Sequence, residues 1–310
     1  MIGKLNNLPI KTFEGSTTPG LHADIDILRV IPSVNVMRAE NTWKKGVLNC
    51  LMIGVKGFPQ QFVLQVFRSD IQKPVKSENA LFKGMFVHHK LDDNTQNCVV
   101  LASDFVLKHA QHLIQPFLSD RSTMASGPSA SFHKDIDIVH ALSVSGNKDN
   151  MKHWIQRTKK GHWPPRELLK EAKYCTWFLV PVGHPSSGND NIQWRLSANL
   201  IERKLMFSLN ITQLKCYVLL KIIKKWISKK IEQQGEASQG GLTSFHCKTV
   251  LFYTIETTQD PPWQECNLAE LLKLCLHTLQ NFLKTGICPH YIIDYVNLFD
   301  GKLNSNSVTQ

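Results

Sequence analysis

The chain has 310 residues, of which 42% are hydrophobic and 20% charged, and its formal net charge is +11 at pH 7. This balance is that of a folded soluble protein with one large or two modest domains. No apolar run approaches the roughly 18 residues of a membrane span, and the first ten residues carry no signal-peptide pattern, so no membrane partner is expected. The basic excess favours acidic partners, although many soluble proteins carry such an excess without one.

The first half of the chain mixes strands with helices. Residues 22–30 alternate in hydropathy, which predicts a strand, and residues 61–67 and 135–139 are further strand candidates. Ser103 is placed to cap a helix that extends to Phe117. Two stretches rich in Ser, Gly or Asn are expected to be loops, at residues 119–131 and 185–191.

The second half is predicted to be one helix after another. Residues 212–231 place apolar side chains on one face and lysines on the other, with Trp226 expected to be half-buried at the edge. Thr243 and Ser244 open a second helix, and residues 233–241 are the expected link between the two. Asn267, with Glu270 three residues later, predicts the N-cap of a third helix, and Gly286 its end. The pattern therefore predicts an α+β region followed by an all-helical region.

The eight cysteines are scattered and form no C-x-x-C pair. Free thiols in a reducing compartment are the simplest interpretation, which places the protein in the cytosol or the nucleus.

Carboxylates on two predicted strands are the first candidates for chemistry. Asp24 and Asp26 lie two residues apart, so both project from one face of their strand. Carboxylate oxygens are ligands for Mg²⁺ or Mn²⁺, and a third acid from a neighbouring strand, for which Asp137 is the candidate, would complete a two-metal site. The competing interpretation is that these aspartates are solvent-facing residues at the edge of a sheet.

Several segments, in order, resemble the male-abnormal-21 (Mab-21) superfamily, the nucleotidyltransferase-fold group that includes cyclic GMP-AMP synthase. The resemblance extends from about Asp24 to Leu303, and its most specific part lies in the second half. The segments that carry it are Gly127-Pro-Ser129, Asp135-Ile-Asp-Ile-Val-His-Ala-Leu142, Trp154, Arg157, Gly161-His-Trp-Pro-Pro165, Leu179-Val-Pro-Val-Gly-His184, Trp194-Arg-Leu-Ser197, Glu202-Arg-Lys-Leu205, Thr243-Ser-Phe-His-Cys-Lys-Thr249 and Tyr291 to Phe299. The chain looks most like the multi-copy branch of molluscs.

The resemblance implies a nucleotidyltransferase lobe over residues 1–190, N-terminally incomplete, and a helical HhH/H2TH-like lobe over residues 191–303, with a tail at 304–310. It implies that Asp24, Asp26 and Asp137 match the catalytic, metal-binding acids, which would hold Mg²⁺ or Mn²⁺.

The resemblance also implies nucleotide contacts for four further residues. Arg195 matches an arginine that touches substrate, Ser244 a serine that lines the nucleotide, and Phe245 an aromatic residue that stacks on a base, while Lys248 lies in the same motif. Three of them have a structural alternative: an ion-pair partner for Arg195, a core aromatic for Phe245 and a solvated lysine for Lys248.

Departures from the family pattern bear on activity. Active members hold the triphosphate with a Gly-Ser pair, and the better register places Ile10-Lys11 at those positions rather than Gly15-Ser16. The family's long helix before that motif is also expected to be missing. No histidine and cysteine cluster stands at residues 208–215, where the vertebrate DNA-sensing branch binds zinc, so no zinc site is expected, and His184, His246 and His290 are expected to be ordinary histidines.

These observations leave three functions open. The first is a metal-dependent nucleotidyltransferase that uses ATP or GTP in nucleic-acid-triggered innate immunity. The second is an inactive nucleotide- or nucleic-acid-binding pseudoenzyme, and the third is a developmental scaffold. Double-stranded nucleic acid is a candidate partner through the lysine face of residues 212–231, whose alternative is a solvated surface. The sequence does not decide the oligomeric state.

Overall fold

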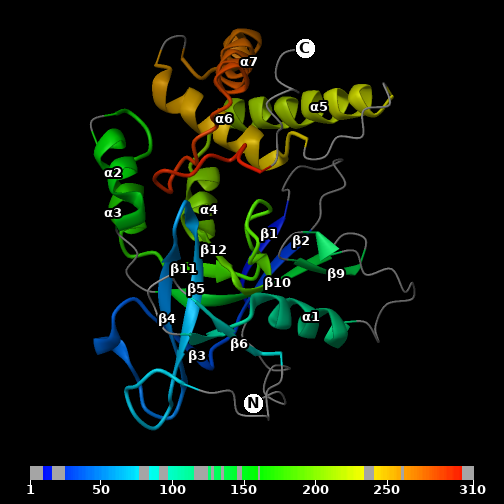
Figure 1. Ribbon diagram of the computed structural model, residues 1–310. Helices are drawn as coiled ribbons and strands as arrows, with labels where there is room; N and C mark the ends of the chain where they lie inside the picture. The colour runs from blue at the N-terminus through cyan, green and yellow to red at the C-terminus, as the bar shows by residue number, and fades with distance from the viewer. Residues whose placement is uncertain are drawn as a thin grey trace. The chain divides into compact units, whose positions relative to one another are not determined.

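The computed structural model shows two compact units that interleave along the chain (Figure 1). Unit 1 comprises residues 1–146 and 176–199, and unit 2 comprises residues 147–175 and 200–310. The structure describes residues 10–15, 25–76, 84–90, 97–114, 125–126, 129–133, 136–144, 149–159, 161–233, 241–259 and 262–301. The sequence predicted a single boundary at residue 190. The two compact units are each built from two segments of the chain, and the predicted boundary stays a prediction.

Unit 1 is built on a curled, twelve-stranded sheet. Its strands are β1 (Ile10–Gly15), β2 (Ile25–Val30), β3 (Val34–Met37), β4 (Leu48–Val55), β5 (Phe58–Phe67), β6 (Phe86–His89), β7 (Cys98–Leu101), β8 (Ala125–Ser126), β9 (Ser129–His133), β10 (Ile136–Val144), β11 (Trp177–Val180) and β12 (Trp194–Ser197). The main path through the sheet is β1-β2-β10-β11-β12-β5-β4-β3. Because β3, at one end of this path, contacts β10 near the other end, the sheet curls on itself.

In the described part of unit 1, two short 3₁₀ helices and one α-helix accompany the sheet. The 3₁₀ helices are η2 (Glu40–Thr42) and η6 (Asp190–Ile192), and helix α1 (Ser103–Ile114) packs against β9, β10 and η6 (Figure 1). The hydroxyl of Ser103 donates to the Asn191 carbonyl oxygen at 3.0 Å, so this residue ties α1 to η6.

The strands predicted from alternation are present where the structure describes them. Residues 61–67 lie within β5, residues 25–30 of the predicted 22–30 form β2, and residues 136–139 lie within β10. The loop predicted at 119–131 is wrong in its last part, because Ser129–His133 pairs antiparallel with β10. Small polar residues form a strand there because a neighbouring strand offers its backbone groups, which outweighs local propensity.

The core of unit 1 is apolar and contains tryptophan. Trp194 is fully buried, and its indole N–H donates to the Leu101 carbonyl oxygen at 3.0 Å. Close packing also fixes the turn at Gly183, where an added Cβ would lie 2.3 Å from the Asp190 Cα. Only glycine fits this approach of two backbone segments.

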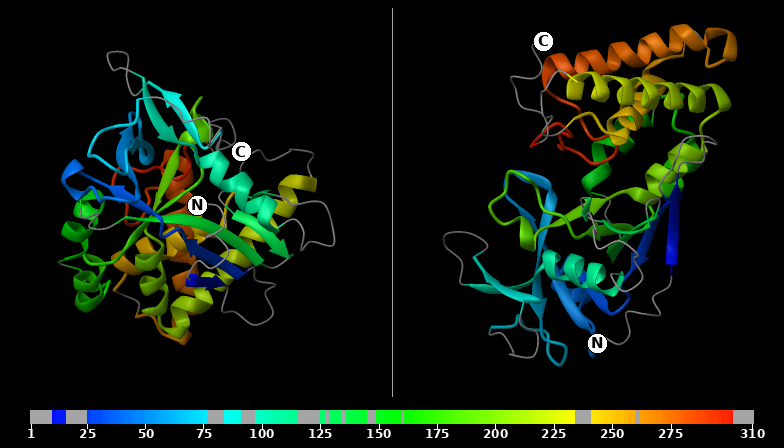
Figure 2. Two further views of the ribbon diagram at one scale, coloured as in Figure 1. Left: turned by 90° about the horizontal axis from the view of Figure 1, so that it is seen from below. Right: turned by 90° about the vertical axis from the view of Figure 1, so that its right-hand side faces the viewer.

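Unit 2 is helical. Its elements are η5 (Asp149–Met151), α2 (Lys152–Thr158), α3 (Arg166–Ala172), α4 (Asn199–Phe207, whose first residue falls in unit 1), α5 (Ile211–Gln233), α6 (Ser244–Thr257), η7 (Glu265–Asn267) and α7 (Leu268–Thr285). Helices α5, α6 and α7 pack against one another, and α5 and α7 run side by side (Figure 2). The predicted α+β region followed by a helical region is confirmed.

The ends of these helices follow the predicted chemistry with one exception. Gly286 adopts the left-handed conformation with φ 68° and ends α7, as expected of a C-terminal glycine. Asn267 stands at the N-cap position of α7 as predicted, but its side chain makes no capping bond, and its amide donates to the Pro262 carbonyl oxygen instead. The 3₁₀ turn η7 leads directly into α7, so Asn267 does not have the extended backbone of a typical N-cap.

An aromatic cluster holds α2 and α6 to the C-terminal segment of unit 2. The guanidinium of Arg157 lies 5.0 Å from the centre of the Tyr253 ring and 5.2 Å from that of Tyr291. Its Nε donates to Glu256 at 2.7 Å and its Nη2 to the Tyr291 carbonyl oxygen at 3.1 Å. Arg157 therefore combines cation–π and charge-assisted contacts in one structural anchor.

Within the described residues, no single helix is long and apolar enough to cross a membrane. Helices α4 and α5 meet the length and composition criteria only as a pair, and that pair is bent by 119°.

Candidate functional site

The predicted acids lie on two adjacent strands of unit 1. Strands β2 and β10 pair in parallel, and residue 26 stands directly opposite residue 137 in their register. The Asp137 side chain is half-buried, whereas Asp24 lies outside the described residues. The backbone thus places two of the three predicted metal-binding positions side by side, as a two-metal carboxylate site requires.

Metal ligation by these acids stays a prediction. Among the side chains that the structure describes, no group of three His, Cys, Asp or Glu residues is arranged to hold a metal ion. Asp24 and the side chain of Asp26 are not among those described, so the acids of β2 and β10 are not tested as a set.

Arg195 belongs to the same sheet. It lies in β12, opposite Val180 of β11 and Gln61 of β5, and its side chain is half-buried between the buried Trp194 and Leu196. Three of the predicted site residues, Asp26, Asp137 and Arg195, are therefore positioned by strands of unit 1.

The other predicted nucleotide contacts belong to the first turn of α6 in unit 2. Thr243 caps this helix: its hydroxyl accepts from the His246 backbone N–H, and the His246 ring nitrogen Nδ1 accepts from the Thr243 N–H at 3.0 Å. This capping box fixes the first turn, on which Ser244 is exposed and Phe245 is half-buried.

Lys248 is part of a buried charged cluster rather than a solvated lysine, so that alternative is wrong. Its ammonium donates to Glu202 of α4 at 2.8 Å, with side-chain exposures of 16% and 10%. Glu202 also lies 3.7 Å from His290 Nε2. Because His290 Nδ1 accepts from the backbone N–H groups of Ile292 and Ile293, its ring proton belongs on Nε2, facing Glu202.

Phe245 covers this cluster. Its ring lies 5.4 Å from the His290 ring and 5.0 Å from the Lys248 ammonium. The structure thus brings Phe245 and Lys248 together and adds Glu202 and His290, which the sequence reasoning did not select. Glu202 lay within a segment of the family resemblance, but nothing in the sequence linked it to Lys248.

The basic helix α5 presents an aromatic side chain among its lysines. Trp226 is 60% exposed, not half-buried as expected, because it lies past the edge of the apolar face. The Lys230 ammonium lies 5.2 Å from the centre of its ring, and Lys225 and Lys229 are exposed beside it. Exposed lysines around an aromatic ring can bind phosphates and stack on a base.

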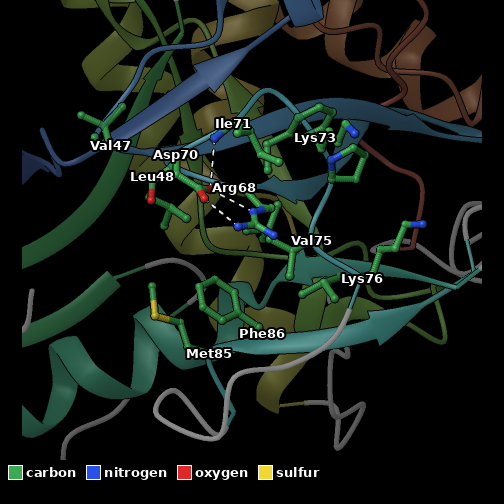
Figure 3. Close-up of a pocket in the computed structure, with 16 residues that line it drawn as sticks. Val47, Leu48, Arg68, Asp70, Ile71, Lys73, Val75, Lys76, Met85 and Phe86 are labelled. Carbon is green, nitrogen blue, oxygen red and sulfur yellow. Dashed lines mark hydrogen bonds and ion pairs between the residues drawn. The ribbon is translucent and has the colours of Figure 1, made fainter.

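A cavity of about 990 Å³ opens elsewhere in unit 1, between the start of β4, the end of β5 and the start of β6 (Figure 3). It contains none of the predicted site residues. Figure 3 shows Arg68 joined to Asp70 in its wall, and hydrogen bonding by this guanidinium lowers the pKa of Asp70 to about 2. The charges of this pair are thus satisfied by each other.

Two comparisons with known proteins complement this geometry. Residues 212–310 match the family model described as the Mab-21 protein HhH/H2TH-like domain. A stretch of 171 residues, 53% of this chain, is 24% identical to a cyclic GMP-AMP synthase-like receptor of Magallana gigas. The match spans 27% of that relative's length. Residues 212–310 therefore match a Mab-21 HhH/H2TH-like domain, and this match, the similarity to the receptor and the mixed sheet of unit 1 support the assignment of the chain to the Mab-21 and cyclic GMP-AMP synthase-like superfamily.

Proposed function

We propose that this protein is a metal-dependent nucleotidyltransferase that joins nucleotides from ATP or GTP in nucleic-acid-triggered innate immune signalling. The observation that carries the proposal is the register of β2 and β10, which sets residue 26 opposite Asp137. Carboxylates brought together on adjacent strands provide the hard oxygen ligands that Mg²⁺ or Mn²⁺ requires.

In this reaction a sugar hydroxyl oxygen forms a bond to the α-phosphorus of a nucleoside triphosphate, and the bond from that phosphorus to pyrophosphate breaks. Asp24, Asp26 and Asp137 would hold two divalent ions, which lower the pKa of the hydroxyl and neutralise the leaving pyrophosphate. Arg195, which β12 of the same sheet positions, would bind a phosphate oxygen. Phe245, in unit 2, is a separate proposed contact that would stack on a base.

Nucleic acid is the proposed activator, and α5 is the proposed contact. Support comes from the exposed Lys225, Trp226 and Lys229 on this helix. Binding by lysines to phosphates is independent of sequence and weakens as salt rises, because condensed counterions are released.

The test is product formation by the full chain from labelled ATP and GTP, with Mg²⁺ or Mn²⁺ and with or without double-stranded DNA or RNA. Asp137→Asn should lower the rate roughly a thousandfold, since one metal ligand supports several kcal/mol of transition-state stabilisation. Asp104→Asn is the matched control, because Asp104 makes only a surface pair with Lys108. Equal turnover by Asp137→Asn and the wild type would contradict the proposal.

A specific observation favours a second function, that of an inactive nucleotide-binding protein. Residues 10 and 11, the positions aligned with the phosphate-binding Gly-Ser pair, are Ile and Lys and lie at the start of β1, which pairs with β2. Neither side chain offers a hydroxyl to a triphosphate. Saturable ATP or GTP binding by a chain that forms no product with any metal and activator would establish this function over the enzyme.

A further inference from the structure

Three basic side chains gather on unit 1 where α1 packs on the sheet. Arg29 of β2 stands directly opposite His140 of β10, and α1, which carries His109, packs against β10 (Figure 1). His140 is only 5% exposed. Burial, followed by the nearby charges of Arg29 and His109, lowers the pKa of His140 to about 4, so the three groups lie within electrostatic reach of one another.

Each of these side chains has a buried nitrogen without a partner. Among the described residues, no group bonds to Arg29 Nε, His109 Nε2 or His140 Nδ1. A buried polar atom left unbonded is costly, and the cost is larger for a charged group such as a guanidinium, which stays protonated at all accessible pH values. Three such atoms near one another are therefore available to hydrogen-bond a ligand.

This cluster is separate from the predicted catalytic acids. Asp137 and His140 are three residues apart on a strand whose register with β2 is continuous, so they project from opposite faces of the sheet. The acids would attract cations on one face, whereas the face under α1 carries the unbonded nitrogens of Arg29, His109 and His140.

We propose that Arg29, His109 and His140 form a binding site for a small oxyanion, a phosphate or a carboxylate group. A guanidinium offers parallel N–H donors that match the oxygens of such a group, and a protonated imidazole donates a further charge-assisted bond. Water would satisfy hydrogen bonds there, whereas an oxyanion would also interact favourably with the charge of Arg29. This inference does not depend on nucleotidyl transfer by the opposite face.

Anion binding at this site should change the protonation of His140. An anion bound between Arg29 and His140 stabilises the imidazolium form, so binding is accompanied by proton uptake near neutral pH. A general effect of salt on the surface would not cause uptake at one buried histidine.

The experiment measures binding of inorganic phosphate to the full chain by calorimetry and thermal denaturation at pH 6.5, with ionic strength held constant by NaCl. The wild type should show saturable binding and a rise in Tm. In NMR, the ring-proton resonances of His140 should move downfield as the ring is protonated, and phosphate should shift the midpoint of this titration to higher pH. Arg29→Met should bind phosphate at least about tenfold more weakly, because a charge-assisted pair is lost. His88→Gln, an exposed histidine in the same unit, is the matched control.

Parallel titrations with acetate and with ATP identify the source of the oxyanion. Tighter binding of phosphate than acetate assigns the site to phosphate, the reverse assigns it to a carboxylate, and competition by ATP would show that a nucleotide phosphate can enter. If Arg29→Met does not fold, Arg29→Lys, which keeps the charge but loses the parallel donors, and His140→Gln replace it. An equal rise in Tm for the wild type and the Arg29 variant, or no binding of either anion at tens of millimolar, would overturn the proposal.

Discussion

The two units differ in how their ionisable groups are satisfied. In unit 2, Arg157 binds Glu256, Lys248 binds Glu202, and His153 binds Asp294, all through contacts inside the unit. In unit 1, buried nitrogens of Arg29, His109 and His140 have no partner among the described residues. These three pairs of unit 2 therefore satisfy one another, whereas the cluster of unit 1 has nitrogen atoms that a ligand can satisfy.

This difference indicates which unit a bound anion should stabilise more. Charges that are already paired gain little from a bound anion, whereas the unbonded nitrogens of Arg29, His109 and His140 would gain hydrogen bonds from one and so stabilise unit 1. The comparison is open to tests on single side chains, and the largest effect is expected in unit 2.

Replacement of Lys248 by Met should lower the free energy of unfolding by about 3 kcal/mol, because it leaves the buried Glu202 without its ammonium partner. Chemical denaturation without nucleotide measures this loss. A stability equal to that of the wild type would show that the cluster is not structural, and would return Lys248 to a role in ligand binding alone.

Two further variants sharpen this result. Lys170→Met, an exposed lysine of α3, should change stability by less than about 0.5 kcal/mol. The double variant Glu202→Met with Lys248→Met should recover much of the loss, since removal of both charges leaves no buried carboxylate to stabilise.

Acid should weaken unit 1 through His140, the second largest effect. The pKa of this histidine is about 4 in the folded protein, against about 6.5 in an unfolded chain. The folded state therefore binds fewer protons, so stability is complete above about pH 6.5 and declines as the pH falls toward about 4. The loss attributable to His140 is up to about 3 kcal/mol.

Denaturation midpoints between pH 7 and pH 4 measure this slope. His140→Gln should flatten it, whereas His88→Gln should leave it unchanged. Phosphate should also flatten it in the wild type, because a bound anion raises the pKa of His140 toward its unfolded value. A slope that persists in His140→Gln would assign the acid sensitivity to other groups.

The sequence predicted the elements whose signal is local. Alternation located β2 and β10, and the apolar periodicity of residues 212–231 located α5, because each pattern reports burial of one face within one element. Strand β9 was missed because its pairing depends on β10, and the exposure of Trp226 was missed because its position at the edge of the face depends on how α6 and α7 pack.

The site was predictable only in part for the same reason. Strand alternation and family resemblance suggested Asp137 as a neighbour of Asp26, and the register agrees at the level of the backbone. Glu202 and Lys248 are 46 residues apart and meet through the packing of α4 and α6. Arg29, His109 and His140 come from three elements, and no spacing rule connects them.

The smallest effect should come from the cap of α6. Thr243→Ala removes the hydroxyl that accepts from the His246 backbone N–H, which should cost about 1 kcal/mol, while Thr243→Ser should retain most of the stability. Thr257→Ala, at the exposed end of the same helix, is the control, because its hydroxyl donates to the carbonyl oxygens of Tyr253 and Thr254 rather than accepting from a backbone N–H group. Equal losses from Thr243→Ala and Thr257→Ala would show that the cap contributes nothing specific. The rise in Tm caused by phosphate should be the same in Thr243→Ala as in the wild type, since the cap belongs to unit 2 and the oxyanion site to unit 1.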